Sequence, residues 1–404
     1  MIVRLALRNL LRQKVRSAMT LAAIVFGVAG LIVSGGCIQD IFVQLGEAII
    51  HSQTGHVQVF RQGFIERGTR QPERFLIERP RETATRIEAL PEVDEVALRL
   101  SFAGLLNNGK RDLGIVGEGI EPGKEARLGS FLQILSGRAL REDDVFAMVV
   151  GQGVAHSLSL AVGDRVNLVL STAEGAMNML DFEIVGIFQS FSKEFDARAL
   201  RIPLGAAQEL LFTDGANLLV ATLHRTEDTD LAHARIAQAV AGSELEARHW
   251  RMLSDFYEKT LALYERQFGV LQAIILVMVL LSVANSVNMT AFERLSEFGT
   301  LLALGNRNAS IFRLILIENI LLGLIGAALG TLIALGIALA VSAVGIPMPP
   351  PPNSNVGYTA MIRIVPATIA SAFMIGLLAT ALAALLPARR ISRIPVVSLL
   401  RNGN

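Results

Sequence analysis

Residues 18–38 read AMTLAAIVFGVAGLIVSGGCI, an apolar run without a charged side chain. A transmembrane helix needs about 20 such residues to cross about 30 Å of hydrocarbon. Further runs of this kind stand in the last third of the chain, at 269–289, 314–344 and 364–386, and Glu318 is the only charge within them. The sequence therefore predicts four transmembrane α-helices, with a long segment of different character between the first and the second.

Basic residues around these runs predict the orientation. Five precede the first run with no acid among them (Arg4, Arg8, Arg12, Lys14, Arg16), and four follow the last (Arg389, Arg390, Arg393, Arg401). Because Lys and Arg collect in cytoplasmic flanks, both termini are expected in the cytoplasm. The segment between the first two helices is then extracytoplasmic, as is the proline-rich loop before the fourth, which carries Arg363 as its single base.

These observations give nine predicted segments. They are a cytoplasmic amphipathic helix at 1–17, transmembrane helix 1 and its external extension at 18–46, an α+β extracytoplasmic domain at 47–254, an external extension and transmembrane helix 2 at 255–290, a cytoplasmic helix and loop at 291–311, transmembrane helix 3 at 312–344, an external loop at 345–363, transmembrane helix 4 at 364–387 with Pro387 closing it, and a cytoplasmic tail at 388–404.

An alternative for the N-terminus is a lipoprotein signal ending at Ser34-Gly-Gly-Cys37. Against it, the position three before the cysteine is Ser34 rather than Leu, and the apolar run is long for a signal peptide. Cys37 is the only cysteine of the 404 residues, so no intrachain disulfide can form.

The long middle segment shows short β runs and amphipathic helices in irregular order, which indicates an α+β domain. The predicted strands are 56–60, 96–106, 111–118, 147–151, 165–170, 182–188, 201–203 and 218–223, and the predicted helices are 82–90, 153–158, 204–211 and 229–241. From Asp255 a helix is expected to enter the second apolar run directly, because no Gly or Pro occurs before Gly269. Such a helix would be a stiff link between domain and membrane.

No catalytic motif stands out in the chain. Gly104-Leu-Leu-Asn-Asn-Gly109-Lys110-Arg111 has the spacing of a phosphate-binding loop, but Arg111 stands where a hydroxyl must reach magnesium. A hairpin turn explains Asn-Asn-Gly-Lys between two β runs better. Adjacent Asp143 and Asp144 are expected in a solvated turn. No basic stripe with interleaved aromatics suggests nucleic acid.

Histidines offer isolated pairs rather than a metal site. No two of the six lie three or four residues apart. Glutamates stand at helical spacing from three of them, in the pairs His51 with Glu47, His224 with Glu227, and His249 with Glu246. A zinc site needs three or four ligands, so surface pairs are the expected reading.

Small residues in the third apolar run predict close helix packing, in a bundle or a dimer. Gly323, Gly326 and Gly330 are the proposed contact positions, and Gly326 with Gly330 form a GxxxG pair. Glu318 is costly in lipid unless it lies near the interface or is paired, and its place near the cytoplasmic boundary favours the interface.

Three segments together resemble the FtsX-like permease family of ABC transporters, in its MacB and LolC/LolE branch. They are ALRNLLRQKVRSAMTLAAIVFGVA (6–29), AFERLSEFGTLLALGNRNASIFRLILIENILLGLIGAALG (291–330) and LPARRISRIPVVSLLR (386–401). The segments VVGQGVAHSLSLAVGDRVNLVL (149–170) and FEIVGIFQS (182–190) are also similar to the periplasmic core of that family. The resemblance covers most of the chain.

The resemblance implies that a separate cytoplasmic ATPase dimer grips the short helix near 293–304 and carries the ATP and Mg, so this chain needs no cofactor and is not itself an enzyme. The implied coupling residues are Glu293, Arg294, Glu297, Phe298, Gly299, Leu301, Leu302 and Gly305. Phe298, Leu301 and Leu302 are expected to enter a groove of the ATPase, with the charged residues at its rim. The alternative is an interfacial helix that lies on lipid.

The resemblance further implies a bacterial inner-membrane permease that works by mechanotransmission, paired with a second permease subunit that is either another copy or a sister chain. Its leading cargo is lipoprotein or another lipid-linked substrate taken from the outer leaflet, for which Gly55-His-Val-Gln-Val59 is a modest cue. One alternative is MacB-type export of drug, peptide or toxin. Another is a scaffold that regulates a cell-wall hydrolase. Membrane lipid and a periplasmic acceptor protein are the other expected partners.

Overall fold

The computed structural model describes residues 14–68, 71–129, 132–172, 175–190, 192–349 and 357–393. The chain divides into two compact units, a helical one within residues 1–42, 260–347 and 359–404, and a mixed one within 43–259 and 348–358. Most of the predicted amphipathic helix (1–13) and the end of the tail (394–404) lie outside the described residues.

The long apolar helices are α2 (Lys14–Ile49), α10 (Asp255–Glu293), α12 (Asn308–Val344) and α13 (Pro366–Ile391). In the described part of the chain these are the 4 helices long and apolar enough to cross a membrane, which confirms the predicted number. The prediction that Pro387 closes the last helix is wrong, because α13 continues through it to Ile391. A proline in a membrane helix is tolerated where neighbours pack around the freed carbonyl, and Pro387 is buried.

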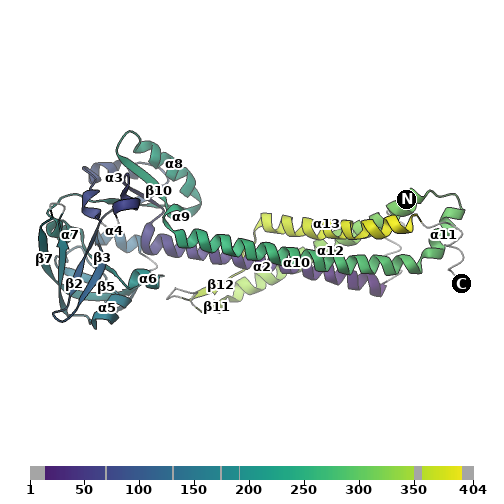
Figure 1. Ribbon diagram of the computed structural model, residues 1–404, viewed down its shortest axis with the longest axis horizontal. Helices are drawn as coiled ribbons and strands as arrows, with labels where there is room; N and C mark the ends of the chain where they lie inside the picture. Colours follow the sequence, from purple (N-terminus) through teal and green to yellow (C-terminus); the bar gives the residue numbers. More distant parts are fainter. Residues whose placement is uncertain are drawn as a thin grey trace. The chain divides into compact units, whose positions relative to one another are not determined.

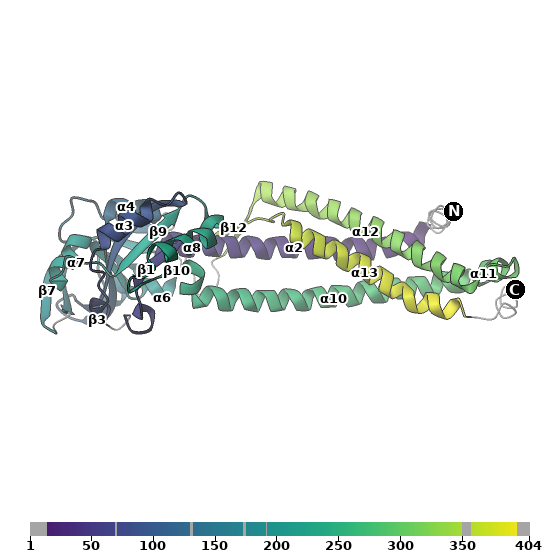
Figure 2. The same ribbon diagram turned by 90° about the horizontal axis from the view of Figure 1, so that it is seen from above.

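The helical unit is held together by aliphatic side chains and close glycine contacts. α12 packs along α13, and Figure 2 shows the two helices running side by side. Its core includes Ile24 and Val28 of α2, Val283 of α10, and a run of small residues on α13. Small residues let helix backbones approach closely, which is the main source of helix association in lipid.

The first module of the mixed unit is split in sequence. Strands β1 (Val57–Arg61), β2 (Val93–Asn107), β9 (Leu218–Leu223) and β10 (Leu245–His249) lie in the order β10-β1-β9-β2, and all are antiparallel to their neighbours. Helix α3 (Pro80–Glu88) joins the first two strands and α8 (Thr229–Ala239) the last two. This is the β-α-β-β-α-β arrangement of ferredoxin-like folds. Figure 1 shows α3, α8 and β10 grouped together.

The second module is inserted between β2 and β9. Its strands are β3 (Asp112–Ile120), β4 (Gln133–Gly137), β5 (Ala147–Gly151), β6 (Arg165–Ser171), β7 (Met177–Gln189) and β8 (Ala199–Pro203). The pairings β2–β3–β8–β5–β7–β6 return to β2 and so close a ring of strands, with β4 added at the edge of β7. Helices α5 (Gln152–Leu158) and α7 (Leu204–Leu211) pack on this ring, and one apolar core runs through both modules.

The remaining elements are short. They are the α-helices α4 (Pro122–Leu128), α6 (Lys193–Asp196), α9 (Trp250–Leu253) and α11 (Leu295–Ala303), the π-helices η1 (Ile50–Thr54) and η2 (Phe64–Gly68), and the 3₁₀-helices η3 (Pro72–Arg74) and η4 (Thr226–Asp228). The paired strands β11 (Ile346–Met348) and β12 (Tyr358–Ala360) lie in the predicted external loop. The large α+β domain between the first two long helices is thereby confirmed.

Candidate functional site

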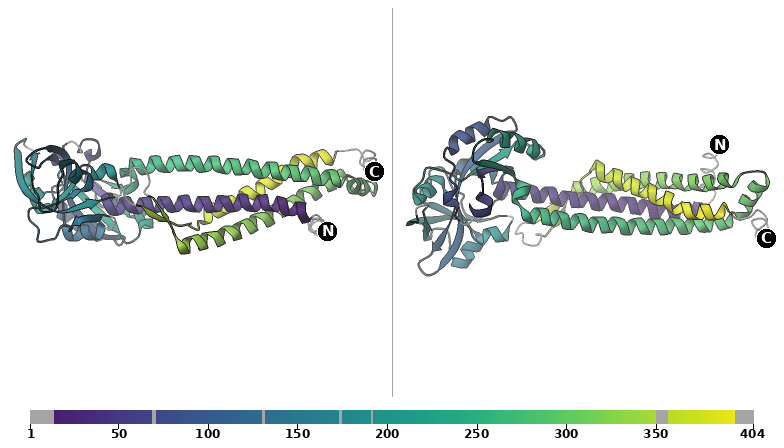
Figure 3. Two further views of the ribbon diagram at one scale, coloured as in Figure 1. Left: turned by 90° about the horizontal axis from the view of Figure 1, so that it is seen from below. Right: turned by 45° about the horizontal axis from the view of Figure 1, so that its top comes forward.

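Helix α11 is the short connection between α10 and α12, as the turn at one end of the helical unit in Figure 3 shows. Arg294 breaks the helical path after α10, with φ −102° and ψ 14°. Gly305 follows α11 with φ +92°, a backbone conformation that glycine adopts without strain. The segment predicted as the coupling helix is therefore a separate helix with defined ends.

Arg294 ties α11 to α12. Its Nη1 lies 2.9 Å from Oε2 of Glu318, and its Nε donates to Oε2 of Glu297 at 2.9 Å. The guanidinium also stands 5.1 Å from the ring centroid of Phe298. Arg294 and Glu318 are 8% and 7% exposed. A buried carboxylate needs such a partner, so pairing with Arg294 compensates the charge of Glu318.

The predicted orientation of α11 is wrong in one respect. Phe298 is 1% exposed and belongs to the apolar core of the helical unit, while Leu301 and Leu302 are partly buried against that core. These side chains were expected to enter a partner's groove. The bundle itself covers them, because an apolar stripe next to the ends of four apolar helices finds its nearest partner within the chain.

The accessible side of the α11 region is different. Glu293, Ser296, Glu297 and Thr300 are exposed, Gly299 is buried, and Gly305 is exposed beyond the helix. Large apolar side chains also stand open here, with Phe292 57% and Leu304 77% exposed. The accessible surface around α11 thus combines charged and small polar side chains with two exposed apolar ones, while Arg294 and Phe298 hold the helix from its buried side.

The three predicted packing glycines of α12 lie in helix contacts. A Cβ on Gly326 would meet Cγ2 of Ile24 at 2.7 Å, and one on Gly330 would meet the backbone oxygen of Val25 at 2.9 Å. A Cβ on Gly323 would clash with Oγ1 of Thr380. These contacts join α12 to α2 and to α13 within one chain.

In the mixed unit, a buried charge cluster receives the end of the α2–η1 helix. Arg99 pairs with Glu125 (Nη2–Oε2 2.9 Å), and Arg201 pairs with Glu118 (Nε–Oε2 3.0 Å). Arg99 also donates to the carbonyl of Gln53, and Nη2 of Arg201 donates to that of Ser52 at 3.2 Å.

This charge cluster is electrostatically balanced and suited to a helix end. Burial disfavours the charged form of Glu125, but attraction by Arg99 and Arg201 outweighs it and lowers the pKa of this carboxyl. Cations at a helix C-terminus are favourable because its free carbonyls carry partial negative charge. The cluster therefore fixes the end of the helix in the centre of the sheet.

The histidine predictions have mixed outcomes. His51 and Glu47 form the predicted pair at 3.3 Å. His224 instead pairs with Asp94 at 3.4 Å, and His249 on β10 has its ring against that of His233, with centroids 5.2 Å apart. Residues three apart on a strand point to opposite faces, which explains why Glu246 is not the partner of His249. Among the described residues, no group of three or more side chains could hold a metal ion.

His56 is buried at the base of η1. Its Nδ1 accepts from the backbone N–H of Leu223 at 3.3 Å, and its Nε2 lies 3.1 Å from Oγ1 of Thr226. Burial, together with nearby His51, lowers the pKa of His56 to about 4.

The phosphate-loop lookalike is the predicted hairpin turn. Asn107 pairs with Asp112 at the end of the β2–β3 ladder, and Gly109 has φ +83°. The side chain of Asn108 accepts from the backbone N–H groups of Lys110 and Arg111. The loop's own polar groups close the turn, so it offers no phosphate cradle.

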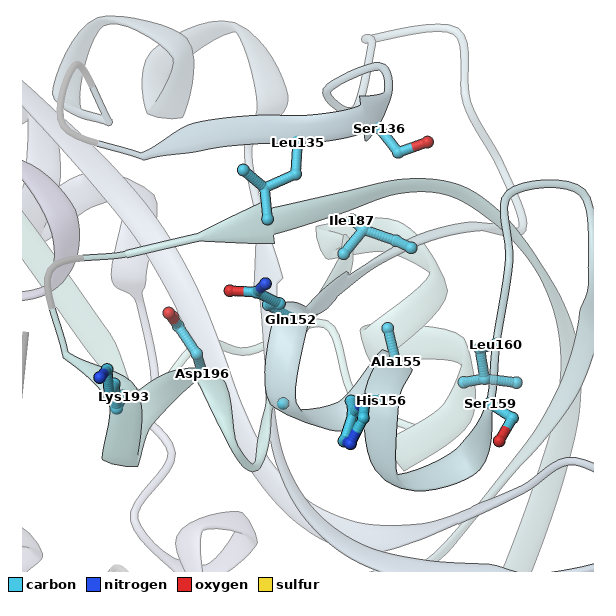
Figure 4. A pocket seen from close by; sticks show the side chains of 11 residues that line it. Leu135, Ser136, Gln152, Ala155, His156, Ser159, Leu160, Ile187, Lys193 and Asp196 are labelled. Carbon is cyan, nitrogen blue, oxygen red and sulfur yellow. The ribbon is translucent and has the colours of Figure 1, made fainter. Parts of the chain in front are cut away.

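A cavity of about 670 Å³ lies between β4, β7, α5 and α6. Figure 4 shows Leu135, Leu160 and Ile187 on its walls with Gln152, His156 and Lys193 around them. Both carboxylate oxygens of Asp196 accept from the backbone N–H of Ser190 at 3.0 Å, so this carboxylate stabilises the local backbone conformation. The cavity can hold an apolar group but shows no arrangement for catalysis.

Two families match the chain. Residues 17–239 match the MacB-like periplasmic core domain, and residues 269–396 match the FtsX-like permease C-terminal domain.

Several relatives are similar in sequence. An uncharacterized ABC transporter permease of Methanocaldococcus jannaschii is 26% identical over 228 residues, 54% of each chain. LolC, the lipoprotein-releasing system transmembrane protein of Xylella fastidiosa, is 24% identical over 250 residues, 60% of each chain. The macrolide export ATP-binding/permease protein MacB of Hyphomonas neptunium is 25% identical over 426 residues, 98% of this chain and 60% of that one. The chain thus spans between 54% and 60% of the length of these relatives.

Among solved structures, the periplasmic region of MacB from Actinobacillus actinomycetemcomitans aligns with a TM-score of 0.37 and 14% identity, over 51% of this chain and 93% of that one. The extracellular domain of YknZ from Gram-positive bacteria aligns with a TM-score of 0.36 and 12% identity, over 48% of this chain and all of that one. The two matched families follow one another along the sequence in the order in which the mixed domain and the later long helices occur. The chain belongs to the FtsX-like permeases of ABC transporters that carry a MacB-like periplasmic core domain.

Proposed function

We propose that this ABC transporter permease works by mechanotransmission, so that movement imposed on α11 by an ATPase reaches the mixed domain through the long helices. The observation that carries the proposal is the continuity of α10, a single helix from Asp255 to Glu293. It has no interruption at Tyr264, whose ring packs edge-on against Phe42 of α2 at 5.7 Å. A continuous helix resists bending and compression better than a jointed one.

Buried charges hold two points among the long helices, one at α11 and one at the end of the α2–η1 helix. At α11, the Arg294–Glu318 pair joins the short helix to α12. At the other end, Arg99 and Arg201 hold the carbonyls that end the α2–η1 helix. Helix ends held by buried charges transmit displacement with little slack, which supports a mechanical role.

The proposed motor is a separate cytoplasmic ATPase dimer that docks on the exposed side of α11, carries the ATP and Mg, and serves two permease subunits. Both termini of this chain are then cytoplasmic, and the mixed domain lies in the periplasm. The residues proposed to contact the ATPase are the exposed ones, namely Glu293, Ser296, Glu297, Thr300 and Leu304. Arg294, Phe298, Gly299, Leu301 and Leu302 position the helix, and Gly305 ends its docking segment.

The proposed substrate is a lipoprotein or another lipid-linked molecule in the outer leaflet of the inner membrane. The LolC relative belongs to a lipoprotein-releasing system, which supports this choice. Macrolide-type export with periplasmic and outer-membrane partners is the second candidate, favoured by the MacB alignment over 98% of this chain. Mass spectrometry of lipid-linked molecules that co-purify with the chain separates the two, since only the first predicts an acylated ligand.

Docking is tested by Leu304→Ser in the full chain, reconstituted with its ATPase. Burying a leucine contributes about 1.5–3 kcal/mol, so the change should weaken ATPase binding about ten- to hundredfold and reduce permease-stimulated ATP hydrolysis. The matched control is Phe212→Ser, because Phe212 is 74% exposed on the mixed domain against 77% for Leu304. Equal ATPase stimulation by both variants would exclude docking at this surface.

A further inference from the structure

Strand β4 is an open edge of the sheet in the mixed unit. It pairs with β7 on one side and ends the strand order, so no described strand lies on its other side. All residues of β4 are exposed, and none of Gln133–Gly137 is charged or a proline. The opposite edge, β10, carries Glu246 and Arg248 instead. Charged side chains and prolines are common means of blocking edge pairing, and β4 has neither.

A bulge in β4 directs an apolar side chain beside this edge. The β4–β7 register shifts between Ile134 and Ser136, which leaves Leu135 as the extra residue. Bulges often re-aim a side chain, and Leu135, 46% exposed, lines the cavity between β4, β7, α5 and α6. Ile187 and Leu160 add to the apolar wall of this cavity (Figure 4). The open edge and the apolar cavity are therefore adjacent and share Leu135.

Lys193 supplies a positive charge at one end of the same cavity. β4 runs antiparallel to β7 with Gln133 opposite Gln189, and Lys193 follows Gln189 by four residues, so it stands towards the Gln133 end. Its side chain is exposed and makes no ion pair within the described part of the chain. Asp196, by contrast, is held by the backbone N–H of Ser190. The formal charge that the cavity offers to a ligand is thus positive.

We infer that β4 binds an extended peptide segment of a partner protein by strand addition, with an apolar side chain of the peptide in the cavity and an acidic one at Lys193. A strand satisfies the open N–H and C=O groups of the edge, which an acyl chain cannot do. Cross-strand neighbours have Cβ atoms about 4.5–5.5 Å apart, so the peptide side chain opposite Leu135 reaches the cavity that Leu135 lines. The inference is independent of the proposed transport mechanism and of its cargo.

The test measures binding of two blocked, fluorescently labelled heptapeptides to the purified full chain by fluorescence anisotropy. Their sequences are Glu-Val-Thr-Leu-Thr-Val-Thr and its reverse, which place the acid at Lys193 for either strand direction. We expect one of them to bind, and salt to weaken its binding. Hydrogen exchange within 133–137 should become slower with that peptide bound, because strand addition engages backbone N–H groups.

Leu135→Lys places a charge at the apolar cavity and should weaken peptide binding about tenfold or more. The matched control is Leu105→Lys, because Leu105 is 48% exposed but lies on β2, which pairs there with both β3 and β6. It should bind the peptide as the original chain does. Lys193→Glu should weaken binding up to about fivefold, and a peptide with Lys in place of its Glu should recover that loss.

Four results would overturn the inference. They are binding of neither peptide, binding without slower exchange in 133–137, an equal loss in Leu105→Lys, and a dimer of the full chain that Leu135→Lys dissociates. The last would assign the edge to a second copy of the chain. Thermal unfolding of all variants without peptide checks that they remain folded.

Discussion

Replacing Gly330 by Ala inserts one methyl group between α12 and α2. The new Cβ would lie 2.9 Å from the backbone oxygen of Val25 and 3.0 Å from Cβ of Val28. Neither atom can rotate away, so the helices must separate by a few tenths of an ångström. Overpacking of this kind costs about 1–3 kcal/mol. Alanine also favours the helix over glycine by about 1 kcal/mol, so the net loss of unfolding free energy is about 0–2 kcal/mol.

Gly336→Ala in the same helix isolates the packing cost. A Cβ at Gly336 has nothing within 4 Å, so this variant carries the propensity gain alone. Unfolding of both full-length variants in mixed micelles, followed by circular dichroism, should therefore show Gly330→Ala less stable than Gly336→Ala by about 1–3 kcal/mol. Equal unfolding free energies would refute the assignment of Gly330 to a close helix contact.

Three further outcomes are expected of the full chain. Arg294→Met should lower the unfolding free energy by about 3–5 kcal/mol because Glu318 stays buried without its partner, and adding Glu318→Leu should recover most of that loss in a double-mutant cycle; additive losses would contradict the pairing. Gly109→Ala should cost about 1–2 kcal/mol through its φ of +83°, whereas Gly114→Ala, at ordinary φ with open space around its Cβ, should not. His56 has a pKa of about 4 when folded, against about 6.5 when unfolded. The unfolded chain therefore protonates His56 at a higher pH than the folded chain does, so protonation favours unfolding. The unfolding free energy is unaffected by His56 above about pH 6.5 and falls by at most about 3 kcal/mol as the pH is lowered towards 4. Thermal unfolding of His56→Gln should lack this part of the acid sensitivity; an unchanged pH profile would assign it to other groups.

Apolar patterning predicted the buried elements well. The bounds of β5, β9 and α7 agree with the predicted 147–151, 218–223 and 204–211 to the residue. All 5 residues of β5, 5 of the 6 in β9 and 5 of the 8 in α7 are buried, and buried apolar residues stand at both ends of each element. The four long helices follow from the same signal, because hydrocarbon solvent allows little else.

Elements without a buried face were missed. All residues of β4 (Gln133–Gly137) are exposed, and all those of β10 (Leu245–His249) are only partly buried, so neither shows alternation. Their strand conformation comes from pairing with β7 and β1, which lie far away in sequence. Local pattern cannot reveal a strand that exists only through a distant partner.

The short helix α11 lies within the segment where the sequence predicted one, but the direction in which its apolar side chains face was not predicted. The sequence pattern of an amphipathic stripe such as Phe298, Leu301 and Leu302 is the same whether the stripe packs against another protein or against the chain's own helices. The pairing of Arg294 with Glu318 decides between them, and it joins different helices. Glu318 standing alone in an apolar run was the available signal, since such a charge calls for a nearby opposite one.

The split module of the mixed unit has an architectural consequence. The insert leaves the module through β2 and returns at β9, where the side chain of Asn217 bridges the N–H and the carbonyl of Ser101, each at 2.8 Å. The two chain segments that connect the insert to the module are therefore held side by side by these hydrogen bonds, which act as a staple. Beyond the staple, hairpins can lengthen, shrink or be exchanged by recombination without shifting β1, β9 or β10, which makes the distal half a natural graft site for engineered binding loops.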